Sequence, residues 1–149
     1  MPNSELNQVR ELAKAFVLLV KNDNTGTNNL HSFVQDRVIN SFSPVGSPVQ
    51  LPEINFEVVL DDKDGNLPSE HGELRLEIRY PTSKGNYVGD SAKVAGRINF
   101  LINEKPSALT AENSNLKCRL CDRISQYPAY DDSRKTYFYS MIFKVILGI

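Results

Sequence analysis

The sequence predicts an α+β fold, a mainly antiparallel sheet of two hairpins that is covered on one face by helices. Three observations lead to this prediction. Apolar residues recur at helical spacing in residues 4–21 and again in residues 92–103. Apolar and polar residues alternate in four other segments, two before the second helical stretch and two after it. Because short connections join antiparallel neighbours, this order favours two hairpins with a helix between them.

The chain has 149 residues, the usual size of one domain, and we expect one core over residues 1–149, with residues 1–29 as a helical N-terminal segment and polar linker. Its 17 Lys and Arg against 18 Asp and Glu give a formal net charge of -1, which argues against nucleic-acid binding. No apolar run approaches the roughly 20 residues that span a bilayer. With two cysteines and no signal-peptide pattern, we expect a soluble protein made in a reducing cytoplasm, without a membrane partner.

The first predicted helix covers residues 4–21, with Ser4 placed to cap its first N–H groups. Residues 22–29 are polar and end this helix. The helical period then resumes at Leu30, Phe33, Val34 and Val38. We expect a second, shorter helix there. Residues 43–52 contain three prolines, which predict a loop.

Two strands are predicted next, at residues 54–60 and 73–80, because apolar and polar residues alternate in both. The connection between them, residues 61–72, is charged and rich in turn-forming residues, so the strands should pair as a hairpin. A third helix, capped by Asp90 or Ser91, then covers the apolar face of the sheet.

The second hairpin is predicted from residues 116–124 and 137–149, joined by a turn at residues 126–135. The alternation in the first of these strands breaks at Cys121, which indicates a bulge or bend. The last strand is the longest. Its apolar face consists of Tyr137, Tyr139, Met141, Phe143, Val145 and Leu147.

Cys118 and Cys121 have the C-x-x-C spacing of zinc and thiol-exchange sites. A structural zinc ion needs four ligands, and the only histidines are His31 and His71. On a strand, residues three apart point to opposite faces. We therefore interpret both cysteines as structural thiols and expect no metal.

Asp61, Asp62 and Asp64 invite comparison with a calcium-binding loop. In that template Leu60 would be the first ligand and His71 the bidentate twelfth, and neither is a carboxylate. We interpret this segment as a charged hairpin connection. Neither a nucleotide-binding glycine pattern nor a nucleophile elbow occurs, so we expect no catalytic residue, no cofactor and no enzyme.

Charges of alternating sign share one face of the second predicted strand. Two interpretations stay open: a solvated face, or a face that meets a second copy and uses the alternation to fix register. With the aspartates of the preceding connection, these residues form the candidate interface: Asp61, Asp62, Asp64, Glu73, Arg75, Glu77 and Arg79.

Most of the chain from about residue 30 onward follows a recognisable order of segments. In sequence these are a helical start, Arg37-Val38-Ile39, a loop that ends in Leu51-Pro52, strands at residues 54–60 and 73–81, a helix at 92–102, and Asp131-Asp132 before a strand at 137–146. In this order the chain resembles the tail terminator and neck proteins of long-tailed bacteriophages, the family typified by the lambda tail terminator.

The resemblance implies a structural virion protein without catalytic residues. It would form a ring, typically a hexamer, that caps the end of the tail tube and joins it to the head connector. Its partners would be copies of itself, the tail tube protein and the connector or neck proteins, with the sheath as a further candidate. It would lie in the virion and, during assembly, in the host cytoplasm. The alternatives are a head–tail connector or neck-ring protein and, from another class, a cytoplasmic ligand-binding α+β domain with a pocket between sheet and helices.

Overall fold

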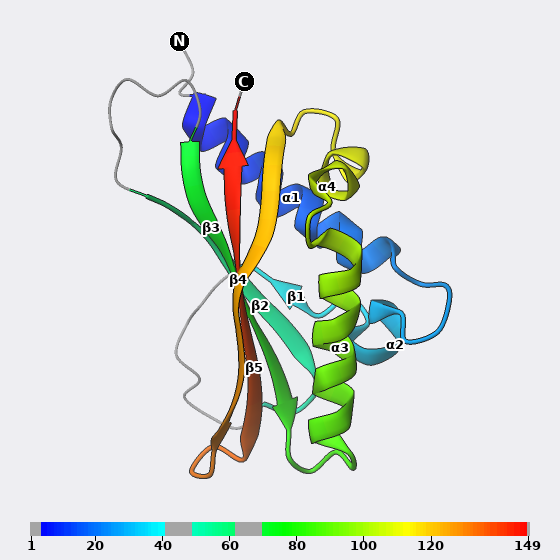
Figure 1. The fold of residues 1–149 in the computed structure, drawn as a ribbon. Coiled ribbons are helices and arrows are strands. Elements are labelled where there is room, and N and C mark those ends of the chain that lie inside the picture. Colours follow the sequence, from blue (N-terminus) through cyan, green and yellow to red (C-terminus); the bar gives the residue numbers. More distant parts are fainter. Residues whose placement is uncertain (1–3, 41–48, 62–69, 149) are drawn as a thin grey trace.

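The computed structural model describes residues 4–40, 49–61 and 70–148. Figure 1 shows helices gathered on one side of a long, twisted sheet. In chain order the elements are α1 (Ser4–Asn22), α2 (Leu30–Val34), β1 (Val38–Ile39), β2 (Glu53–Leu60), β3 (Glu70–Pro81), α3 (Tyr87–Ile102), α4 (Pro106–Glu112), β4 (Cys118–Asp131) and β5 (Thr136–Leu147). None of the helices in the described residues is long and apolar enough to cross a bilayer.

The sheet has five strands in the order β1-β2-β3-β5-β4. Two antiparallel hairpins, β2–β3 and β4–β5, meet where β3 pairs with β5. β1 is the exception, since it runs parallel to β2. The predicted α+β fold with a mainly antiparallel sheet of two hairpins is therefore confirmed, and the short parallel strand adds to it.

The core lies between the sheet and the helices. Alternate residues of β3 and β5 are fully or almost fully buried on this side, which we call the covered face: Leu74, Leu76, Ile78, Met141, Phe143 and Val145. Buried residues of α3, such as Ile98 and Ile102, pack against them. The prediction that the helix between the hairpins covers the apolar face is confirmed (Figure 1).

The N-terminal helix belongs to this same core. Phe16 of α1 is fully buried, and its ring lies 4.9 Å from that of Phe56 on β2, edge to face. At the other side of α1, the Asn113 amide donates to a Glu11 carboxylate oxygen at 2.7 Å. α1 therefore packs on both the sheet and the segment after α4.

Two predicted helix boundaries were wrong, and one helix was missed. Val38 lies in β1, paired with Ile54, because α2 ends at Val34 and the next residue, Gln35, has a φ of 52° that a helix cannot continue. α3 begins at Tyr87, so Asp90 lies in its first turn instead of capping it. Ser91, the other proposed cap, is inside the helix. α4, which starts with a proline in its first turn, was not predicted.

Two predicted turns proved to be partly strand. Of the turn predicted at residues 126–135, only 132–135 connect the strands, since β4 continues to Asp131 and β5 starts at Thr136. Similarly, β3 begins at Glu70, so Gly72 pairs with Leu60 instead of lying in the connection. A Cβ atom at Gly72 would lie 2.6 Å from the Val59 carbonyl oxygen, so this close approach requires glycine. The predicted bulge in β4 is confirmed by two shifts of register.

Candidate assembly surface

The sheet face turned away from the core, which we call the open face, carries the predicted charges. Because side chains alternate along a strand, burial of Leu74, Leu76 and Ile78 on one side places the charged residues of β3 on the other. On β2 their neighbours include two glutamates, whereas on β5 only Lys144 is charged and Phe138, Ser140 and Ile142 lie opposite the other three residues. The directly opposed pairs are Glu53 with Arg79, Glu57 with Arg75, and Glu73 with Lys144.

Arg75 is the exposed centre of one charged group on the open face. Its Nη2 atom lies 2.8 Å from Glu73 Oε1, and its Nη1 atom 3.8 Å from Glu57 Oε1. The Arg75 side chain is 42% exposed, so water screens both pairs. Exposed ion pairs of this kind contribute about 0 to 1 kcal/mol to stability. Their charges stay available to a second molecule.

Arg79 is held differently. Its side chain is only 6% exposed, and Nε donates to Glu77 Oε1 at 2.6 Å, with Glu53 Oε1 3.9 Å from Nη1. The buried Arg79 guanidinium and the carboxylates beside it depend on one another. Removing one of them leaves the charge of the other uncompensated, which is strongly unfavourable. In the candidate interface, Arg79 therefore orders the neighbouring carboxylates, whereas Arg75 presents its charge.

Of the predicted interface residues, the structure brings together Glu73, Arg75, Glu77 and Arg79. Asp61 lies just past the end of β2, exposed, and its backbone N–H donates to the His71 carbonyl at 2.8 Å. The other two aspartates of the candidate interface, Asp62 and Asp64, lie outside the described residues, as does the rest of the predicted charged connection up to residue 69.

The end of β4 adds exposed apolar residues that we did not predict. β4 is the last strand of the sheet, and the segment after α3 covers only its first part, where the Glu104 N–H donates to the Cys121 carbonyl at 2.8 Å. Further along, Ile124, Tyr127 and Tyr130 are each at least half exposed, with Tyr127 paired to Ser140 on the open face and Tyr130 paired to Tyr137 on the opposite side of the sheet. Exposed aromatic residues are enriched at protein interfaces.

The two cysteines share the covered face, so the expectation that they point to opposite faces was wrong. The register shift after Cys118 inserts an extra residue, and Cys118 and Cys121 then pair with Leu147 and Val145, both core residues. Burial raises the pKa of the Cys118 thiol to about 11, and burial with the nearby Cys118 raises that of Cys121 further. Both thiols are free. Within residues 4–40, 49–61 and 70–148, no group of three or more His, Cys, Asp or Glu could hold a metal.

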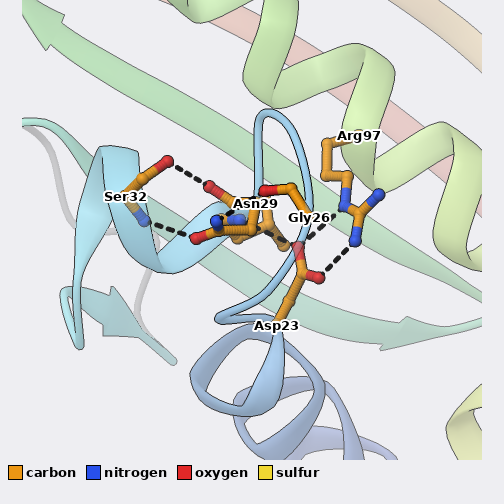
Figure 2. Close-up of polar contacts among 6 residues, drawn as sticks. Asp23, Gly26, Asn29, Ser32 and Arg97 are labelled. Carbon is orange, nitrogen blue, oxygen red and sulfur yellow. Dashed lines mark hydrogen bonds and ion pairs between the residues drawn. The ribbon is translucent and has the colours of Figure 1, made fainter.

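A partly buried polar cluster fixes the segment that we had interpreted as a linker (Figure 2). The Asp23 carboxylate accepts hydrogen bonds from Arg97 Nε at 2.9 Å and from the Leu30 N–H at 2.8 Å. Burial opposes ionisation, but these bonds hold the pKa of Asp23 below its usual range. Asn29 caps α2 by accepting from the Ser32 N–H at 2.9 Å. An Asp and an Asn flanking a glycine at the end of a helix were the signal available in the sequence.

No protein-family model matches this chain, and no curated protein does. Among solved structures, 14 chains match. One of these belongs to a structure described as the virion of a native gene transfer agent (GTA) particle, with a TM-score of 0.55 and 7% sequence identity. The match covers 91% of this chain and 92% of that one. The two chains therefore share a fold over nearly their whole length, and the predicted role as a tail terminator stays a prediction.

Proposed function

We propose that this protein is a non-enzymatic structural component of a phage-like virion, and that it forms a ring at the head–tail junction. The ring would cap the end of the tail tube and join it to the head connector. The observation that carries this proposal is the fold shared with a chain of a gene transfer agent virion over 91% of the sequence. The order of segments that resembles tail terminators supports the narrower role.

The two exposed surfaces are suited to contacts between copies. The open face presents the charged pairs of β2 and β3, and the end of β4, at the edge of the sheet, presents exposed Ile124, Tyr127 and Tyr130 on both of its sides. These surfaces differ in chemistry, so contact between one surface of a copy and the other surface of the next would be heterologous. A heterologous interface forms a closed ring when its rotation closes, and a hexamer is the expected size.

A head–tail connector or neck-ring protein is the second candidate. The fold likeness is to a chain of a whole virion particle and does not distinguish positions along it. Both roles place the protein in the virion after assembly in the host cytoplasm. In both roles the protein associates with copies of itself and binds a neighbouring ring. A terminator also binds the tail tube protein on one side. The two roles differ in which particle part the ring binds.

The test is electron microscopy and mass photometry of the purified full chain, alone and mixed separately with isolated tail tubes and with filled heads of the same virus. We expect rings that decorate one end of the tail tubes. Rings that bind only to heads would favour the connector or neck role. A monomer at every concentration that decorates neither part would contradict both.

A further inference from the structure

A polar hollow of about 420 Å³ opens beside the start of α3, on the helix side of the sheet. Residues from α2, from the approach to β2, from the end of β3 and from the first turn of α3 line it. Its lining includes Phe33, Arg37, Leu51, Tyr80, Lys84 and Asp90. None of them belongs to the open face or to the exposed end of β4, so the hollow is distinct from the candidate assembly surface.

Tyr80 is a buried donor that lines this hollow. It is 2% exposed as a residue, and it lines the hollow. Burial and the nearby Asp90 carboxylate raise the pKa of Tyr80, while Arg37 opposes them. The phenol therefore keeps its proton at neutral pH. A ligand acceptor in the hollow can take the hydrogen bond of this hydroxyl in place of water.

Arg37 supplies a second donor, with its orientation already fixed. Its Nε atom donates to the Pro52 carbonyl at 2.6 Å and its Nη1 atom to Gln35 Oε1 at 3.3 Å. The Nη2 atom has no hydrogen-bond partner within the described part of the chain. A guanidinium held by two bonds loses little freedom when it binds an acceptor. Lys84 adds a further positive charge at the rim.

The balance of charge selects the ligand. Arg37 and Lys84 are positive, whereas Asp90 is negative and accepts from the Asn86 amide at 3.3 Å. One net positive charge and several free donors fit a singly charged acceptor, whereas a doubly charged phosphate would be repelled by Asp90. Phe33 and Leu51 add an apolar wall beside these donors.

We propose that this hollow binds a carboxylate carried by a peptide segment. Tyr80 and Arg37 donate to the carboxylate oxygens, and an apolar neighbour in the peptide packs on Phe33 and Leu51. Either an acidic side chain or a free C-terminus can supply the carboxylate. That a neighbouring virion subunit presents this peptide rests on the proposed function, but the binding itself does not.

The experiment is an NMR titration of the ¹⁵N-labelled full chain with four probes. They are acetyl-Leu-Glu-amide, acetyl-Leu-Leu with a free carboxyl terminus, the neutral acetyl-Leu-Gln-amide and inorganic phosphate. We expect saturable shifts of the Gly85 and Asp90 amide signals with one or both carboxylate peptides and none with the neutral peptide. Binding of the first identifies an acidic side chain as the source, and binding of the second a C-terminus. Equal binding of the neutral peptide, tighter binding of phosphate, or no binding by either carboxylate peptide would overturn the proposal.

Variants then test the individual groups. Arg37→Gln should weaken carboxylate binding about tenfold or more, and Tyr80→Phe, which removes one oxygen, about two- to tenfold. Asp90→Asn should strengthen it, because a repulsive charge is lost. Arg134→Gln, on the β4–β5 turn, is the control and should leave binding unchanged. Should Arg37→Gln fail to fold, unchanged affinity in both Tyr80→Phe and Asp90→Asn would contradict the proposal. Ring formation is measured separately, so failure here and failure of assembly are distinguishable.

Discussion

The two faces of the sheet are built from the same strands but held by different forces. On the covered face, apolar side chains of β3 and β5 are buried against α1 and α3. On the open face, alternate residues of β3 carry charges that pair with Glu53 and Glu57 of β2 and lie opposite Lys144 of β5. The covered face supplies stability through burial, which is large and insensitive to salt. The open face supplies charges that contribute little within one copy and become important only in contact with another.

The largest effect should come from the covered face. Phe16→Ala removes a fully buried ring that packs on Phe56, and we expect it to lower the free energy of unfolding by about 3–5 kcal/mol. Leu18→Ala on the same helix is the matched control, because Leu18 is exposed, and it should cost far less. Chemical denaturation followed by circular dichroism measures both. Equal losses would mean that α1 does not belong to the core.

On the open face, substitution of the two arginines should change the stability by different amounts. Arg79→Ala leaves the Glu77 and Glu53 carboxylates without their buried partner and should cost about 3 kcal/mol. Arg75→Ala removes an exposed pair and should cost about 0–1 kcal/mol. Thermal melting of the two variants side by side provides the comparison. A larger loss for Arg75 would reverse the roles assigned to these residues.

The Asp23 cluster predicts a pH dependence. The pKa of Asp23 is lower in the folded chain than in the unfolded one, so its stabilisation is present above the unfolded pKa of about 4 and is lost as pH falls through the folded pKa. Asp23→Asn should therefore cost about 1.5–3 kcal/mol at neutral pH and progressively less in acid. Unfolding free energies of both proteins across this range give the difference. The exposed Asp36→Asn is the control, and a constant difference for Asp23→Asn would exclude the linkage.

The smallest effect concerns the thiols. Cys118 and Cys121 are buried on the covered face, and their raised pKa values keep them protonated near neutral pH. We expect almost no reaction with a thiol reagent in the native protein and release of two equivalents after denaturation. Rapid labelling of the native protein would show that this end of β4 opens readily.

The sequence predicted the elements with the clearest periodicity and failed where tertiary contacts decide. The alternation of residues 73–80 identified both faces of β3, because Leu74, Leu76, Ile78 and Tyr80 of the covered face are buried and every residue of the other face up to Arg79 is charged. Val38 was assigned to a helix because it continues the helical spacing of the residues before it. In the structure it pairs with Ile54 on β2, which lies beyond a long connection, so the local spacing could not reveal this pairing. The bulge near Cys118 was predicted, but its consequence for the direction of the thiols was not.

The candidate functional surfaces also combine features that the sequence predicted with features that only tertiary contacts determine. The charges of β3 could be read from the sequence, whereas the burial of Arg79 depends on partners on β2 as well as on its own strand. The hollow beside α3 could not be predicted, because its residues come from four separate segments that only the fold brings together. Asp23 and Arg97 are 74 residues apart, so no local pattern pairs them.

The most direct test of the proposed assembly is the mass of the particles formed by an Arg75→Glu and Lys144→Glu double variant. Both residues lie on the open face, one half-buried and one exposed, and Arg79 is left in place because its charge is structural. We predict a melting temperature close to that of the unsubstituted protein and a marked loss of rings in mass photometry, with the rings of the unsubstituted protein also weakened by salt. Rings that form to the same extent in both proteins across a range of salt concentrations would contradict the assignment of the open face as the contact between copies.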